Sequence, residues 1–214
     1  MESQVRGGTR WKRFALVMVP SVAATAAIGV GLAQGALAAS FSVSGQEFKV
    51  HADQLVGHNL IQYGSIATGK DLKGKDAAHP VVVSGFSDAK ITNMCQSVVT
   101  PDVPFFGSIT LRLEAGTDAK KPVEASNLYL DVSELNTDAE FTNIDIGVAA
   151  GDPSNKTGIQ PNAKPQVNPY GFAQRADVAK LSDVKQKAWA TTAGTFKLSG
   201  LSLRLSTGTD KECY

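Results

Sequence analysis

Alternation of apolar and polar residues is the dominant pattern of this chain. It is clearest in Phe196–Leu205, where the leucines of the second half are separated by serine and arginine. Related stretches occur at Phe41–Val50, Phe106–Leu113 and Phe141–Val148, and Pro80–Phe86 is a run rich in β-branched residues. A period of two residues is typical of a strand with one buried face, so each of these stretches is predicted to be a β-strand.

A second pattern precedes three of these strands: an alanine, then an asparagine or aspartate two or four residues later, followed directly by an apolar residue. Its copies are Ala89–Cys95, Ala125–Leu130 and Ala179–Val184. In each copy the asparagine or aspartate lies 17 or 18 residues before an apolar residue of the next strand. These intervals predict hairpin repeats of about 25 residues. The expected fold is all-β and mostly antiparallel, as a barrel-like, curled or sandwich sheet, with a β-solenoid as the alternative.

Four other segments are assigned from their composition. Gly64–Pro80 has little apolar content and is predicted to be a solvated loop. His51–Ile61 fits either a short helix or a second strand, whereas Arg175–Ala190 contains helix formers but matches the strand pattern better. Gly151–Gln174 contains four prolines and is predicted to be a long irregular loop.

The N-terminus has the pattern of an export signal. Basic residues precede the apolar run Phe14–Ala38, which ends in Ala-Leu-Ala, a small-residue cleavage motif. We therefore expect residues 1–38 to be a signal peptide and residues 39–214 to form one all-β domain containing the loop at 151–174. The alternative is an uncleaved membrane anchor, because the run is long enough to span a bilayer.

Charge and cysteines narrow the choice of partners and location. Without residues 1–38 the chain has 17 basic and 19 acidic residues, a balance that gives no electrostatic basis for binding nucleic acid. The two cysteines, Cys95 and Cys213, are expected to form a disulfide because an exported chain meets oxidising conditions. Closing so long a loop is worth roughly 4–5 kcal/mol.

Candidate catalytic residues are few. Gly85–Ala89 is a degenerate form of the G-x-S-x-G nucleophile elbow, which needs a strand that runs into a helix. A β-turn is the simpler interpretation, because a second strand is predicted to follow. If the protein is a hydrolase, Ser87 with His79 is the pair that the sequence offers for nucleophilic catalysis.

Metal and cofactor sites find no support in the sequence. His51 and His58 would align only on a helix, and they would need a third ligand such as Asp53. The chain contains neither a phosphate-binding loop nor a dinucleotide fingerprint. We expect no metal and no cofactor.

An apolar ligand or a protein partner is the remaining possibility. Long strands with one aliphatic face either fill their own core or curl around an apolar cavity. Tyr170 and Phe172, at the end of the proline-rich loop, are candidates for contact with such a ligand, or for anchors that hold the loop in place.

The chain resembles a secreted family of Streptomyces and related actinomycetes. The resemblance is carried by Thr92–Pro101, Phe141–Ala150, Asn168–Gln174, Ala188–Phe196 and the C-terminal Lys211–Tyr214. It implies export from an actinomycete and a role at the cell envelope. Many members are labelled "cholesterol esterase", but the resemblance brings no catalytic residues with it.

These observations predict a non-enzymatic cell-envelope protein that binds an apolar or lipid ligand, or an envelope partner. One alternative is a secreted hydrolase of sterol or lipid esters. Another is a structural surface protein whose strand edges meet neighbouring copies. Membrane association through the N-terminal segment is compatible with each of them.

Overall fold

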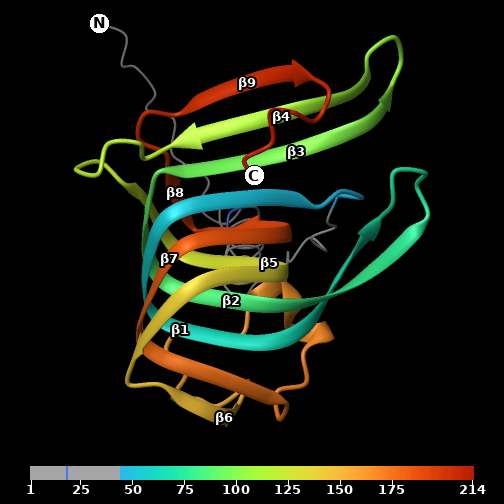
Figure 1. Cartoon of the computed structure of the whole chain (residues 1–214). Helices are drawn as coiled ribbons and strands as arrows, with labels where there is room; N and C mark the ends of the chain where they lie inside the picture. The colour runs from blue at the N-terminus through green and yellow to red at the C-terminus, as the bar shows by residue number, and fades with distance from the viewer. Residues whose placement is uncertain (1–17, 19–43) are drawn as a thin grey trace, which may run out of the picture. The chain divides into compact units, whose positions relative to one another are not determined.

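The computed structural model describes Met18 and residues 44–214, and its dominant elements are long β-strands (Figure 1). The elements are β1 (Phe48–Lys70), β2 (Asp76–Thr92), β3 (Met94–Val103), β4 (Gly107–Ala115), β5 (Val123–Thr142), β6 (Asp145–Ala149), the 3₁₀ helix η1 (Pro161–Gln166), β7 (Phe172–Thr192), β8 (Thr195–Lys197) and β9 (Ser202–Thr207). The nine strands belong to one sheet in which neighbours are antiparallel. The predicted all-β, antiparallel fold is confirmed.

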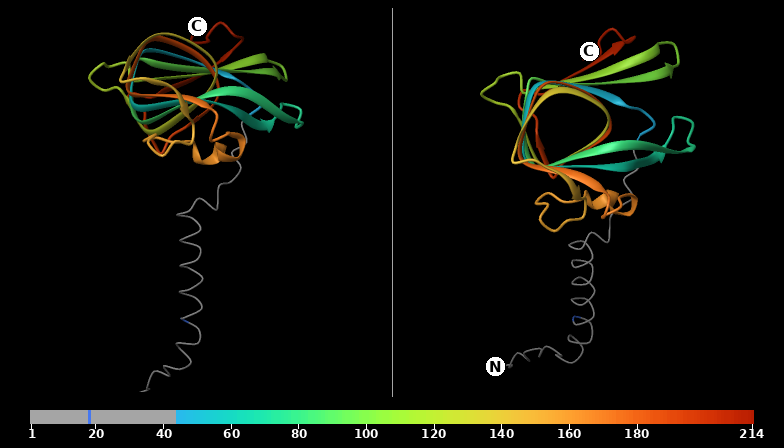
Figure 2. Two further views of the ribbon diagram at one scale, coloured as in Figure 1. Left: turned by 90° about the horizontal axis from the view of Figure 1, so that it is seen from below. Right: turned by 60° about the horizontal axis from the view of Figure 1, so that its bottom comes forward.

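The four longest strands close on one another. β1 pairs with both β2 and β7, and β5 also pairs with both β2 and β7, so these four pairings form a closed circuit. β3, β4 and β9 continue the sheet beyond β1, and β6 continues it beyond β7. Figure 2 shows the resulting ring of strands from two further directions. The sheet is curled, but its side strands prevent it from being a clean barrel.

The main core lies inside this ring. Each of the four closed strands contributes aliphatic or aromatic side chains to one buried cluster, including Leu55, Phe86, Leu128 and Leu181. Alternate residues of a strand face opposite sides, so the period-2 pattern of the sequence supplies the inward-facing set. Burial of such side chains contributes roughly 1.5–3 kcal/mol each.

Asparagine and aspartate residues bend the long strands at positive φ. Their φ angles lie between 48° and 53° at Asn59, Asn93, Asn127, Asn143 and Asp183. Among non-glycine residues, asparagine and aspartate adopt this left-handed conformation most readily. Three of the five are the polar residues of the recurring sequence pattern, which therefore marks a shared backbone bend. At Asn93 the bend separates β2 from β3, and at Asn143 it separates β5 from β6.

The proline-rich loop between β6 and β7 packs on the outer face of the ring. Two tyrosines hold it: the backbone N–H of Gln160 donates to the Tyr63 hydroxyl at 2.8 Å, and the Tyr129 hydroxyl donates to the Thr157 carbonyl at 2.9 Å. The buried Asn155 side chain donates to backbone carbonyls at the start of the loop. A second buried cluster forms between the loop and the sheet.

The predicted segment boundaries are wrong at several places. Residues 64–80 are not a loop, because β1 continues to Lys70 and β2 begins at Asp76, leaving a turn of five residues. The segment 51–61 is strand, as one of its two predictions had it, but it continues β1 instead of forming a second strand. The stretch 196–205 is interrupted between β8 and β9, whereas the strand predicted at 175–190 is confirmed as part of β7. Long cross-strand pairing overrides the local turn signals of residues 64–80, whereas at 196–205 the turn at Gly200, with a φ of 67°, interrupts the strand.

The predicted signal peptide or anchor at residues 1–38 lies outside the described residues, as do residues 41–43 of the first predicted strand. Within the part of the chain that the structure describes, no helix has the length and apolar character needed to cross a bilayer.

Gly57 provides a test of the packing inside the ring. A Cβ atom at this position would lie 2.3 Å from a ring carbon of Phe86, which is buried. We expect Gly57→Ala to lower the free energy of unfolding by about 1–3 kcal/mol, because the ring must leave its packed position. Urea denaturation of the purified variants measures this change.

Gly64, also in β1, is the matched control because a Cβ atom there would have no other atom within 4 Å. Gly64→Ala should change stability by less than about 0.5 kcal/mol. Adding Phe86→Leu to Gly57→Ala should recover part of the loss. Equal stabilities of Gly57→Ala and Gly64→Ala would contradict the packing described here.

Candidate functional site

The predicted catalytic pair does not meet. Ser87 and His79 both lie on β2, eight residues apart, which at about 3.3 Å per residue places them on the order of 25 Å apart along the strand. The single proton of the Ser87 hydroxyl is shared between the His58 carbonyl and Asp88 Oδ2, each 3.2 Å away. The His79 ring instead stacks on Trp189 with 3.5 Å between ring centroids. Hydrolase activity therefore stays a prediction, and Ser87 and His79 do not have the geometry of a catalytic triad.

The histidine nearest to Ser87 is His58, which the sequence did not single out for catalysis. Its Nδ1 lies 2.7 Å from Asp88 Oδ1 across the β1–β2 pairing. Among residues 44–214, no histidine ring nitrogen hydrogen-bonds a serine hydroxyl. Only the strand register brings His58 and Asp88 together, and residue spacing alone does not reveal that register.

The histidines do not form the predicted helical pair. β1 is a strand, and His51 Nδ1 lies 3.1 Å from the Val184 carbonyl oxygen while its Nε2 lies 3.6 Å from Asp53. Within residues 44–214 no three histidine, cysteine, aspartate or glutamate side chains converge as metal ligands.

The two aromatic candidates lie on the surface. Tyr170 is 90% exposed and Phe172 is 66% exposed, so neither is an anchor that buries the loop. Phe172 begins β7 and pairs with Ala149 of β6. Contact with a ligand at these positions remains a prediction.

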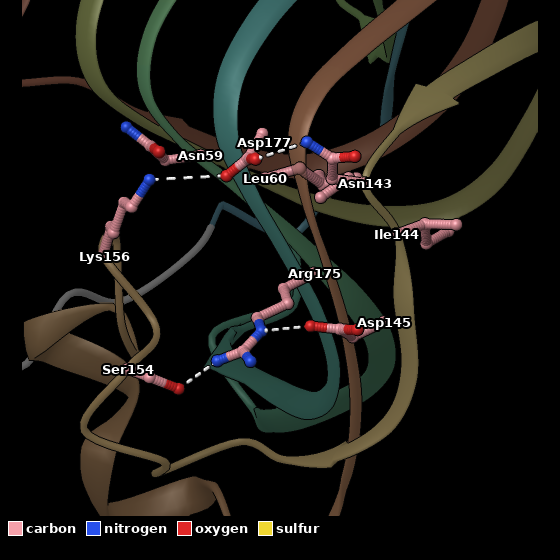
Figure 3. A pocket seen from close by; sticks show the side chains of 10 residues that line it. Asn59, Leu60, Asn143, Ile144, Asp145, Ser154, Lys156, Arg175 and Asp177 are labelled. Atoms are coloured by element: carbon pink, nitrogen blue, oxygen red, sulfur yellow. Dashed lines mark hydrogen bonds and ion pairs between the residues drawn. The ribbon is translucent and has the colours of Figure 1, made fainter.

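A polar cleft of about 430 Å³ lies beside the loop, between Asn143 and Ser154 (Figure 3). Arg175 reaches Asp145 at 2.9 Å and also contacts Ser154. On the other side, Asp177 accepts a hydrogen bond from Asn143 at 2.9 Å.

The charged groups of this cleft are already paired with one another. The hydrogen bond from Asn143 lowers the pKa of Asp177, and Lys156, 3.3 Å away, lowers it further. Hydrogen bonds from Ser154 likewise lower the pKa of the neighbouring Asp152. The cleft is therefore a closed network that stabilises the loop, and a ligand would have to displace these contacts.

A more unusual surface lies on the arm formed by β3, β4 and β9, which lie side by side in Figure 1. Paired residues of antiparallel strands share a face, so the register defines three rows across the arm. These rows are Val98–Leu111–Leu205, Gln96–Leu113–Leu203 and Thr100–Ile109–Thr207. We call this surface the leucine face. None of its nine side chains is charged.

The outer part of the leucine face is exposed although it is mainly apolar, whereas Leu113 packs against the main core. Leu111 is 38% exposed, Leu203 57% and Leu205 69%. At the end of the same arm, in the turn between β3 and β4, Phe105 is fully exposed and Phe106 is 60% exposed. Contiguous apolar surface of this kind marks interaction sites in soluble proteins.

The C-terminal residues 208–214 contact the opposite, polar face of the arm. Arg112 donates to the Glu212 carbonyl at 3.2 Å, and the Thr110 hydroxyl donates to the Gly208 carbonyl at 2.6 Å. The sulfurs of Cys95 and Cys213 lie at disulfide distance, which confirms the predicted disulfide. The C-terminal segment thus covers the polar face. On the leucine face Leu113 packs against the main core, whereas Leu111, Leu203 and Leu205 stay exposed.

One small apolar void lies among the described residues of the ring. The apolar void lined by Val50, Met94, Leu128 and Phe196 holds about 20 Å³, roughly enough for one water molecule. An acyl chain or a sterol does not fit in this void.

Fold and surface together define an all-β protein built on one curled antiparallel sheet with an exposed apolar arm. The chain belongs to the family described as a family of unknown function (DUF6230), whose model matches residues 44–214. No curated protein and no solved structure matches the chain.

Proposed function

We propose that the protein is an exported, non-enzymatic protein of the cell envelope that binds a partner protein through the leucine face. The observation that carries this proposal is the exposure of Leu111, Leu203 and Leu205 on a surface without a charged side chain. Leaving such a surface in water forgoes the gain of about 25 cal/mol for each Å² of apolar area buried. A partner that covers it recovers that energy.

Binding is better supported than catalysis. The charged side chains of the polar cleft are paired with one another, and Ser87 lacks a histidine base at hydrogen-bond distance. The apolar void described above does not favour a lipid ligand, because its volume is about 20 Å³. The disulfide is compatible with an extracellular protein, and the N-terminal export pattern supports secretion.

Replacing leucines of this face by aspartate tests the proposal. We expect Leu203→Asp and Leu205→Asp each to weaken retention of the protein in the envelope fraction of its host by at least tenfold, because a buried aspartate would remain unpaired in the interface. Both side chains are exposed in the free protein, so its stability should change by less than about 0.5 kcal/mol.

Ile146→Asp is the matched control. Ile146 is 67% exposed on β6, the strand at the other edge of the sheet. This variant should be retained as well as the wild type. Full retention of the leucine-face variants, or equal loss in all three, would contradict a partner at the leucine face.

A further inference from the structure

Beside the leucine face, β9 leaves one edge of the sheet unpaired. β9 is the last strand in the sheet order and pairs with β4 along Ser202–Thr207. Within residues 44–214, no other strand pairs with it. A free edge offers a row of backbone N–H and C=O groups to an additional strand.

The outward-pointing backbone groups belong to the three residues that β9 contributes to the leucine face. The N–H of Gly208 donates to the Ser108 carbonyl at 2.9 Å, so this opposing pair is a hydrogen-bonded one. Hydrogen-bonded and non-hydrogen-bonded pairs alternate along an antiparallel ladder. Ser202, Arg204 and Ser206 therefore bond to β4, and the groups of Leu203, Leu205 and Thr207 point outward.

The same three residues of β9 therefore contribute side chains to the leucine face and backbone groups to the free edge. We propose that the partner adds a β-strand to β9, with alternate apolar side chains beside Leu203 and Leu205. This inference rests on the proposed function. Strand addition obtains affinity from main-chain hydrogen bonds and specificity from alternate side chains. The added strand is uncharged on that face, because the leucine face offers no opposite charge.

Two other occupants fit the surface less well. In a bilayer the free backbone groups of Leu203, Leu205 and Thr207 would stay unpaired, at a cost that excludes open sheet edges from hydrocarbon. A second copy that paired through its own β9 would satisfy the edge, but it would leave the leucine faces of both copies uncovered. A partner strand followed by an apolar segment satisfies the edge and the face together.

The test uses an octapeptide that alternates valine or leucine with threonine and is blocked at both ends. Its binding to the full-length protein is measured by hydrogen exchange resolved to single amides. We expect the peptide to slow exchange at Leu203, Leu205 and Thr207 by at least tenfold, and to leave the amides already bonded to β4 unchanged. Unchanged exchange at all three outward amides overturns the strand addition.

A pair of variants separates the edge from the face. Leu205→Pro and Leu205→Ala both remove the leucine, but only proline removes the outward N–H, and proline is tolerated on an edge strand. The peptide should bind Leu205→Pro at least tenfold more weakly than Leu205→Ala. Equal binding overturns strand addition, whereas the proposed function is decided separately by envelope retention of Leu203→Asp. Sedimentation that shows a dimer lost in Leu205→Pro would assign the edge to a second copy and overturn the partner strand.

Discussion

Replacing Cys213 with serine should lower the free energy of unfolding by about 4 kcal/mol. The disulfide to Cys95 closes a loop of 118 residues, and the chain-entropy model gives roughly 4–5 kcal/mol for a loop of that length. The bond joins the C-terminus to β3, which links the arm to the ring through β1. Urea denaturation of the oxidised wild type and of Cys213→Ser measures the difference.

The same C-terminal segment has non-covalent contacts that serve as the control. Glu212 forms an ion pair of 2.9 Å with Lys49, and such partly exposed pairs contribute at most about 1 kcal/mol. Glu212→Gln should therefore change stability far less than Cys213→Ser. A loss below about 1 kcal/mol for Cys213→Ser, or two free thiols in the folded protein by mass spectrometry, would contradict the account of the disulfide.

Replacing Asp131 with asparagine should stabilise the protein at neutral pH. Asp131 lies on β5, is 7% exposed, and its Oδ1 has no hydrogen-bond partner among the described residues. Burial raises the pKa of Asp131 from 3.8 to about 6, because the ionised form loses its hydration. At neutral pH the folded protein therefore holds an unpaired buried carboxylate.

The pH dependence follows from this direction. Because the pKa of Asp131 is higher in the folded state, protonation stabilises that state. The contribution is fully present below about pH 3.8 and is lost as the pH rises toward 6. Each unit of difference between the folded and unfolded pKa corresponds to about 1.36 kcal/mol. After allowance for solvent screening, the loss in the free energy of unfolding is on the order of 2 kcal/mol. Asparagine at position 131 is neutral at every pH and therefore avoids this loss of stability.

Denaturation of Asp131→Asn and the wild type at several pH values tests this expectation. The variant should be more stable by about 2 kcal/mol near pH 7.5 and equal to the wild type near pH 3.5. Asp138→Asn, at an exposed position of the same strand, is the control and should change stability by less than about 0.5 kcal/mol. A constant difference between Asp131→Asn and the wild type at every pH would contradict the role of ionisation.

Residue periodicity was sufficient to predict the fold class but not the strand lengths. The alternation around Leu203 and the β-branched run at 81–83 indicate strands, because apolar residues occupy the buried positions of a strand and polar residues the exposed ones. The glycines and charges between residues 64 and 80 resemble a loop, yet those residues extend a hairpin whose stability comes from pairing across the sheet. The asparagines at 93 and 127 recur because each permits the same backbone bend.

The candidate site was harder to predict because it depends on register and on which face is left open. The sequence shows that Leu111 and Leu205 alternate with polar neighbours, and burial of both was the natural expectation. Only the pairing of β4 with β9, together with the C-terminal segment on the opposite face, shows that these leucines face solvent. The same holds for His58 and Asp88, which lie 30 residues apart in the chain and meet across β1 and β2.

The central claim is that the leucine face contacts another protein in the envelope. The most direct test places a photo-crosslinking phenylalanine derivative at position 205, and at position 146 as the reference, in the full chain expressed in its host. We predict adducts at 205 with an uncharged, strand-forming segment of one envelope protein, lost when Leu203→Asp is added, and no such adduct at 146. Adducts at 205 with lipid alone, with this chain's own peptides alone, or equal to those at 146 would contradict the claim.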